Sequence, residues 1–228
     1  MKWLDFSRVF PPGSHTLFSP SSPAWNNDKT KEDILSRFYR SFLKEIGTAV
    51  HEEACDHIIA KTKTSVSEAR KSLLRKLVKT RVYVNGRAMK IPRKAYDLDY
   101  LAHNFSNCVN DAIDYGLDPE IQLYFSDWNA GTTDAIGYDE KNKILRIHDL
   151  KTGTTPAKFT QLENYAALYF LIYGRFNQIS PTDTKVELRI YQDGEIHEEY
   201  PTAESILSLM DSIIFHSQVV SEAEENDE

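Results

Sequence analysis

Two aspartates lie in a short segment that otherwise reads as two strands joined by a turn. The segment GTTDAIGYDEKNKILRIHDLKTG places Asp134 in the first apolar run and Asp149 at the end of the second. If the runs pair as antiparallel strands, the two carboxylates become close neighbours across the pair. Such a pair destabilises a fold unless a cation compensates for the repulsion. Because Mg²⁺ and Mn²⁺ prefer carboxylate oxygens, the pair predicts a site for one of these ions.

A lysine follows the second aspartate at a spacing that puts both side chains on one face. Lys151 lies two residues after Asp149, and alternate residues of an extended strand point the same way. Two acids and a lysine suit metal-assisted phosphodiester hydrolysis, in which the ion activates water and the lysine positions it or stabilises the transition state. The D-x-K pattern alone is common in surface turns, and Asp134 could simply cap a turn. Further motifs must therefore support the site.

The hydrophobic pattern predicts elements of both kinds around this pair. We expect a mixed α/β fold, with helices over about 31–61, 65–80, 96–116, 159–174 and 203–219, and strands over about 121–125, 132–138, 144–150, 185–191 and 195–200. Gly116 and Gly174 end two of the helices, and Asp193-Gly194 predicts a hairpin turn between the last two strands. The order is helix, three strands, helix and strand.

Length and composition favour one domain. A chain of 228 residues with 41% hydrophobic residues can bury one sizeable core, which we place at residues 31–220. The first 30 residues are rich in Ser, Pro and Asn and predict an irregular leader, and the acidic tail 221–228 predicts disorder.

Two further features bear on location and on metal type. No apolar segment approaches the ~20 residues that span a bilayer, and the start MKWLDFSRVF lacks a signal-peptide pattern, so a cytoplasmic protein without a membrane partner is expected. The cysteines Cys55 and Cys108 lie far apart in the sequence. They support neither a disulfide framework nor a cysteine-built zinc or iron–sulfur site.

A basic segment interrupts an otherwise acidic chain. Residues 61–94 hold twelve Lys or Arg residues and the single acid Glu68, a local net charge of +11, although the whole chain has a net charge of −7. The first part predicts a helix with a Ser65–Glu68 capping box and an apolar face made of Val66, Ala69, Leu73, Leu74, Leu77 and Val78. Asn85-Gly86 then predicts a hairpin.

The basic segment has two interpretations. A solvated helix face with a charged edge strand is the simpler one. A basic helix and a basic hairpin in an acidic protein together favour contact with the phosphates of a nucleic acid. The candidate contact residues are Arg70, Lys71, Arg75, Lys76, Lys79, Arg81, Arg87 and Lys90.

Four motifs occur in order along residues 47–165. GTAVHEEA in the first long helix is followed by G-T-T-D-A-I, then by D-L-K-T-G, and then by Q-L-E-N-Y. This set resembles the PD-(D/E)XK nuclease superfamily in its RecB-like branch, whose Gly-x-x-x-His and Gln-x-x-x-Tyr motifs it matches. The resemblance implies that the metal ligands are His51, Asp134, Asp149 and the backbone carbonyl of Leu150. It also implies that the catalytic residues are Asp134, Asp149, Lys151, Gln161 and Tyr165, the last two orienting the lysine or the scissile strand.

The resemblance implies a fold and an activity. The fold is a restriction-endonuclease-like core of a helix, a three-stranded antiparallel meander, a helix and a strand, with a basic helix–hairpin insertion at about 61–96 and a C-terminal helix. The activity is that of a Mg²⁺- or Mn²⁺-dependent DNA nuclease, an exonuclease of recombination, repair or processing. Relatives that hold an iron–sulfur cluster use four cysteines, so with two cysteines no cluster is expected.

Other roles and partners stay open. A structure-specific endonuclease of the same superfamily and a non-catalytic DNA-binding or assembly module are the alternatives. The expected partner is DNA that is single-stranded or has ends, with a second copy of the chain or a recombination protein as further candidates. The compact single-domain members that the chain resembles occur in phages, which would place it in the host cytoplasm.

Overall fold

The computed structural model describes residues 17, 19–21, 23–84 and 87–227. Most of the predicted leader and the predicted Asn85-Gly86 turn lie outside these residues. The described N-terminal part contains a 3₁₀ turn, η1 (Pro23–Asn27), and the helix α1 (Lys31–Arg40), which begins with a capping box between Thr30 and Asp33.

The long helix expected over 31–61 is in fact two helices. α1 ends at Ser41, whose backbone N–H and side chain both return to carbonyls of the last turn, and α2 (Leu43–Ile59) begins after Phe42. Phe42 is 1% exposed. The change of direction therefore buries a large aromatic side chain in the core.

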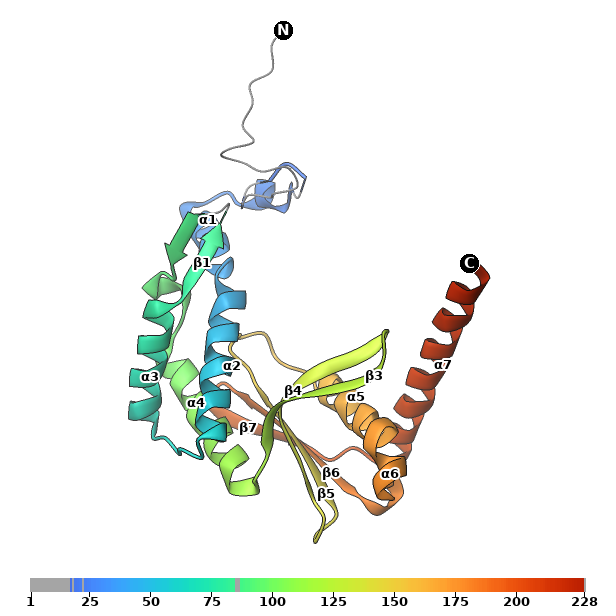
Figure 1. Cartoon of the computed structure of the whole chain (residues 1–228). Helices are drawn as coiled ribbons and strands as arrows, with labels where there is room; N and C mark the ends of the chain where they lie inside the picture. The colour runs from blue at the N-terminus through green and yellow to red at the C-terminus, as the bar shows by residue number, and fades with distance from the viewer. Residues whose placement is uncertain (1–16, 18, 22, 85–86, 228) are drawn as a thin grey trace.

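Helices α2, α3 (Val66–Lys79) and α4 (Leu98–Tyr115) form one layer (Figure 1), with the two-stranded hairpin β1 (Arg81–Val84) and β2 (Arg87–Lys90) and the 3₁₀ turn η2 (Arg93–Ala95) near α1. The Ser65–Glu68 capping box predicted for α3 is present. The predicted apolar face of α3 is partly wrong, because Leu74 and Val78 are exposed. α3 packs on α2 and α4 rather than on the sheet, so a narrower apolar stripe suffices.

A five-stranded sheet forms the centre of the molecule. Its order is β3 (Asp118–Ser126), β4 (Asn129–Asp139), β5 (Ile144–Leu150), β6 (Lys185–Gln192) and β7 (Glu195–Glu199). The first three strands form the predicted antiparallel meander, β6 pairs parallel with β5, and β7 pairs antiparallel with β6. The chain is therefore a mixed α/β protein.

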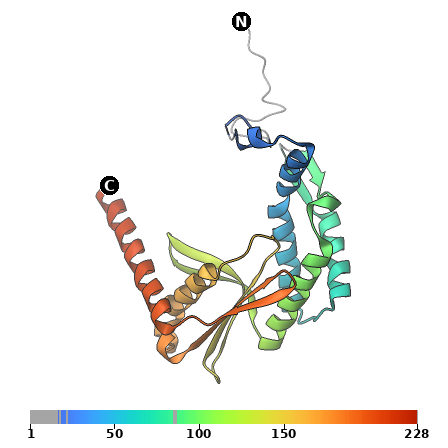
Figure 2. The same ribbon diagram turned by 180° about the vertical axis from the view of Figure 1, so that it is seen from behind.

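The second helical layer covers the opposite face of the sheet (Figure 2). α5 (Thr160–Tyr169) continues through a π-helical turn, η3 (Phe170–Gly174), into the short α6 (Arg175–Asn177), so the helix does not end at Gly174 as predicted. After the 3₁₀ turn η4 (Pro181–Asp183) and strands β6 and β7, α7 (Ala203–Asp227) packs on α5.

The C-terminal helix is longer than the sequence indicates. We expected it to end near Val219, before a disordered acidic tail at 221–228. α7 instead continues to Asp227, and its C-terminal turns extend away from the sheet (Figure 1). Among the described residues, no helix combines the length and the apolarity that crossing a membrane requires.

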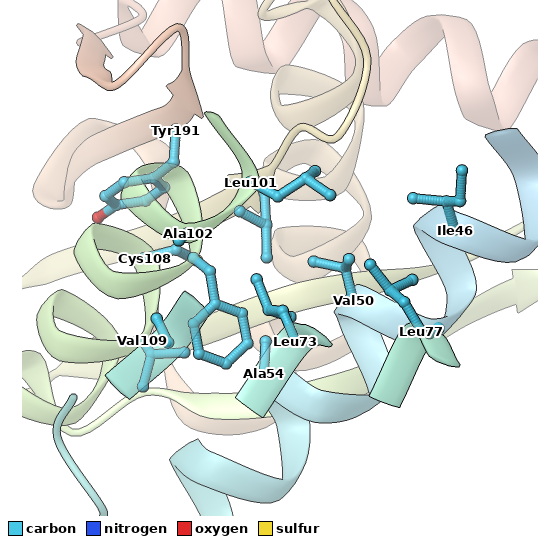
Figure 3. Close-up of a cluster of buried hydrophobic side chains, with 14 of the residues drawn as sticks. Ile46, Val50, Ala54, Leu73, Leu77, Leu101, Ala102, Cys108, Val109 and Tyr191 are labelled. Atoms are coloured by element: carbon cyan, nitrogen blue, oxygen red, sulfur yellow. The ribbon is translucent and has the colours of Figure 1, made fainter. Parts of the chain in front are cut away.

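Buried side chains form one core on each face of the sheet. Figure 3 shows the core under the first helical layer, where α2, α3 and α4 meet through side chains that include Val50, Leu73 and Leu101, with Tyr191 reaching in from β6. The second core lies between the sheet and α5 and includes Ile147, Leu162 and Leu188. The two cores fix the strand ends relative to α2 and α5, which carry the site.

Candidate functional site

The two aspartates are next to each other where the pairing of β4 with β5 ends. In the register of β4 and β5, Ala135 pairs with His148, and Asp134 and Asp149 occupy the next position along each strand. Asp134 Oδ2 also accepts a hydrogen bond of 2.7 Å from the backbone N–H of Leu150. The neighbourhood predicted from the sequence is therefore confirmed, and one Asp134 oxygen is held by the backbone.

The histidine on α2 joins this pair. His51 Nδ1 lies 3.0 Å from Asp134 Oδ1. The helix is held in place by the buried side chains of Ile46 and Val50, which leaves His51 on the face toward the sheet end. Residues 83 positions apart in the chain thus meet at one point.

The lysine joins the aspartates to α5. Lys151 Nζ donates to Asp149 Oδ1 at 2.9 Å and to Gln161 Oε1 at 3.2 Å. Gln161 Nε2 in turn donates to the hydroxyl of Tyr165 at 3.1 Å, one helical turn further along α5. The predicted residues Asp149, Lys151, Gln161 and Tyr165 therefore form one hydrogen-bonded chain.

Burial and charge perturb the titration of this cluster. Burial, and after it the charge of Asp134, raise the pKa of Asp149 to about 6, although Lys151 opposes the rise. Burial alone would lower the pKa of His51, but the hydrogen bond and charge of Asp134 outweigh it and raise this pKa. The chain thus concentrates negative charge in a partly desolvated place, which a bound cation would relieve.

One residue of the site was missed by sequence reasoning. Glu120 of β3 lies opposite Asp134 in the β3–β4 register, and one ligand atom each of His51, Glu120 and Asp134 lie within 4.8 Å of one another. Burial, and then the charge of Asp134, raise the pKa of Glu120. In the sequence Glu120 is an ordinary strand residue. The pairing of β3 with β4 and the packing of α2 on β3 together bring it to His51.

The donor set fits a hard divalent cation. It offers carboxylate oxygens from Glu120 and Asp134 and one imidazole nitrogen from His51, and Asp149 lies beside this group, next to Asp134. Within the described part of the chain, the buried Oδ2 of Asp149 has no hydrogen bond of its own, although it lies 2.8 Å from Lys151 Nζ. Mg²⁺ and Mn²⁺ take such oxygen-rich sets. A cavity of about 680 Å³ opens beside His51, Glu120 and Asp134.

The loop after β5 is anchored from two elements. Asn104 of α4 donates to the carbonyl of Lys151 at 3.0 Å, and Tyr100 donates to the carbonyl of Gly153 at 2.7 Å. Gln192 of β6 binds backbone groups of Gly153, Thr155 and Ala157. The backbone of Lys151 is therefore fixed independently of its ammonium group.

The predicted phosphate-contact residues lie apart from this cluster. α3 packs on the outer side of α2 and α4 (Figure 1), so α2 separates it from the aspartates. Arg70 pairs with Asp99 at 2.9 Å and Lys76 with Glu52 at 3.0 Å. Arg81 donates to the carbonyls at the end of α3.

Four of the eight predicted phosphate-contact residues have no ion-pair partner among the described residues. Lys71, Arg75, Lys79 and Lys90 are exposed, and none forms an ion pair with a carboxylate of the described residues. The side chain of Arg87 lies outside the described residues. The free cations of the basic segment therefore form a smaller set than the sequence predicted.

Comparison with known proteins adds no relative. No protein-family model, no curated protein and no solved structure matches this chain.

Proposed function

We propose that this chain is a metal-dependent DNA nuclease of the PD-(D/E)XK superfamily, with a restriction-endonuclease-like core in its RecB-like branch. The observation that carries the proposal is the contact chain that joins His51 to Asp134 and Asp149 to Lys151, Gln161 and Tyr165. All of these residues were named from their order in the sequence. A helix, a three-stranded meander, a crossover helix and a parallel strand supply the framework.

The protein groups have separate roles in this proposal. His51, Asp134, Asp149 and the carbonyl of Leu150 would hold Mg²⁺ or Mn²⁺, which lowers the pKa of a bound water and neutralises phosphoryl charge. Lys151, aligned by Asp149 and Gln161, places its ammonium group where charge develops on the scissile phosphate. The water oxygen forms a bond to phosphorus as the bond to one ester oxygen breaks. That oxygen leaves with a proton as a hydroxyl group.

Several features favour a catalytic site over a binding module. Asp149 is 5% exposed and lies beside Asp134, an arrangement that costs stability in the absence of a cation. A surface that only binds DNA gains nothing from two adjacent carboxylates, which repel phosphates. We propose an exonuclease rather than an endonuclease, and a comparison of linear with circular DNA distinguishes the two.

A cleavage assay tests the proposal. Labelled linear and circular DNA, each single- and double-stranded, is incubated with purified protein and Mg²⁺, Mn²⁺ or EDTA. We expect metal-dependent loss of linear DNA, and no loss with EDTA. Cleavage of circular DNA would indicate the endonuclease. Absence of cleavage with either metal would contradict the proposal.

Variants then assign the roles. Asp149→Asn should abolish cleavage, whereas Glu140→Gln in the exposed β4–β5 turn should leave it unchanged. Lys151→Ala should lower turnover by orders of magnitude, yet calorimetry should still detect metal binding. Loss of metal binding with residual turnover in Lys151→Ala would reverse the roles of Lys151 and Asp149.

A further inference from the structure

A second cavity lies next to the lysine end of the contact chain. Its volume is about 440 Å³, within the range of small-molecule sites, and it is formed by the turn between β3 and β4, by α5 and by α7. Trp128 comes from the turn, Asn164 and Tyr165 come from α5, and His216 comes from α7. None of these residues was assigned a function above except Tyr165.

The residues that line this cavity differ chemically from those that line the cavity beside His51, Glu120 and Asp134. Its described lining residues include no acid, Lys or Arg, whereas the metal cavity is lined by Glu52, Asp56, Glu120 and Asp134. Leu168, Leu209 and Ile213 supply apolar surface, and Trp128 is 54% exposed, so its ring is open to a ligand. Uncharged aromatic and amide groups suit a nucleobase, which stacks and forms hydrogen bonds, rather than a phosphate.

The cavity is continuous with the candidate catalytic groups. Gln161 and Tyr165 line it, and Gln161 also accepts the hydrogen bond from Lys151 Nζ. A ligand in the cavity therefore lies one side chain away from the lysine.

The rim of the cavity is tied down before any ligand binds. Asn129 Nδ2 donates to Ser217 Oγ of α7 at 2.7 Å, and Ser126 Oγ lies 3.1 Å from the same oxygen. An irregularity in the β3–β4 register between Tyr124 and Ser126 sets the direction of the turn that carries Trp128. A fixed rim lowers the ordering cost of binding.

We propose that this cavity takes an unpaired nucleobase of the DNA strand whose adjacent phosphate lies at Lys151. This inference rests on the proposed nuclease function and specifies its substrate: a base inside the cavity cannot be paired, so the strand is single-stranded or frayed at an end. Trp128 stacks on the base, and Asn164 and His216 offer hydrogen bonds to its edge.

Binding measurements on the Lys151→Ala protein with Mg²⁺ test the inference, because slow turnover preserves the DNA. The ligands are a labelled single-stranded thymidine oligonucleotide, an abasic oligonucleotide of equal length, and a blunt duplex. Trp128→Ala should weaken binding of the thymidine strand by about five- to 150-fold, the value of one stacked base. Binding of the abasic strand and of the duplex should change less than about twofold.

Two further variants sharpen the result. Tyr124→Ala removes an aromatic residue that is 60% exposed on the same hairpin but does not line the cavity, and it should have no effect. Ser212 is an exposed residue of α7 that lines the cavity, so Ser212→Phe adds bulk there while Trp128 is kept, and it should reproduce the loss. If Trp128→Ala does not fold, Ser212→Phe tests in its place whether the cavity binds a base.

The outcomes separate this inference from the proposed function. Equal loss for thymidine and abasic strands, no loss at all, or no binding of single strands by the parent protein would overturn the base site. Base-dependent binding that Trp128→Ala removes, in a protein whose wild type cleaves no DNA, would support the base site and contradict the nuclease. Cleavage of DNA by the wild type, together with equal binding of the thymidine and abasic strands, would support the nuclease and contradict the base site.

Discussion

Glu120 shows how a single residue can belong to a site that its own sequence context does not reveal. It adopts φ of 53°, a left-handed conformation uncommon outside glycine, and such positions cost about 1–3 kcal/mol unless the surrounding structure holds them. The register on either side continues without a shift, from Pro119 opposite Ala135 to Ile121 opposite Thr133. The strain is therefore confined to the residue that faces Asp134 and His51.

If Glu120 is part of the metal centre, Glu120→Gln should weaken Mg²⁺ binding by about tenfold or more, because it removes one negative charge beside Asp134. Isothermal titration measures the affinity directly. Glu52→Gln is the matched control, since Glu52 lines the same cavity but pairs with Lys76 of α3. Equal affinity in Glu120→Gln and the parent protein would show that Glu120 only lines the cavity.

The other site residues could be predicted because their types and spacings can be read from the sequence without knowledge of the fold. Asp149 and Lys151 share a face at a spacing of two, and Gln161 and Tyr165 share one at a spacing of four, as the structure confirms. Glu120 was not predictable, since its contact with His51 requires two separate long-range pairings. The chemical role of every member stays a prediction.

At the level of elements, the position of the α5 residue Tyr165 against β4 depends on one glycine. A Cβ at Gly131 would lie 2.6 Å from Cε1 of Tyr165, closer than two carbon atoms can approach. The Tyr165 ring can therefore lie this close to β4 only because residue 131 has no side chain. The same ring carries the hydroxyl that receives the hydrogen bond of Gln161.

Gly131→Ala should displace the Tyr165 ring and loosen the alignment of Lys151 through Gln161. We expect turnover to fall by about tenfold or more, metal affinity to stay within about twofold, and the free energy of unfolding to fall by about 1–3 kcal/mol. Kinetics, calorimetry and denaturant titration measure the three effects. In a Tyr165→Leu background, Gly131→Ala should have little additional effect on turnover. A full additional loss there would place the damage elsewhere.

Element types were more predictable than element boundaries. The five sheet strands and the capping box of α3 follow the sequence pattern, because alternation and capping are local signals. The break at Ser41–Phe42 and the π-helical turn at 170–174 do not follow from local sequence signals. The break buries Phe42. The π-helical turn buries Gly174 and Phe170, and Phe170 is 3% exposed. Tertiary packing decides both.

The whole molecule separates its charges. The acidic cavity is lined by α2, β3 and β4, and the exposed cations Lys71, Arg75 and Lys79 lie on α3, on the outer side of α2 and α4. A DNA strand held by α3 would have to pass around α2 to reach Asp149. The basic segment therefore suits a distant part of a long substrate rather than the phosphate that is cut.

Replacing Lys71, Arg75 and Lys79 together with glutamine should weaken binding to all DNA sequences alike. The slope of log affinity against log salt should become shallower by roughly 0.7 to 0.9 per lost phosphate contact. The paired residues Arg70 and Lys76, replaced in the same way, should change the slope less, since each already has a protein carboxylate. An unchanged slope in the triple variant would make the helix a solvated surface only.

The parallel pairing of β5 with β6 has a consequence for how the protein folds. β5 meets β4 across a short turn, but it meets β6 only after the chain has passed through α5, which is a loop closure of more than 30 residues. Short-range contacts form more readily in a folding transition state. The aspartate pair should therefore come together before β6 docks beside β5.

Folding kinetics can resolve this order. Leu145→Ala, in β5 opposite Tyr138, should slow refolding, whereas Leu188→Ala, in β6, should chiefly accelerate unfolding; both side chains are fully buried. Stopped-flow refolding and unfolding across a denaturant range gives both rates. Slower refolding in Leu188→Ala would reverse the order. In the expected order, the two aspartates are already neighbours while the sheet beside β5 is still incomplete.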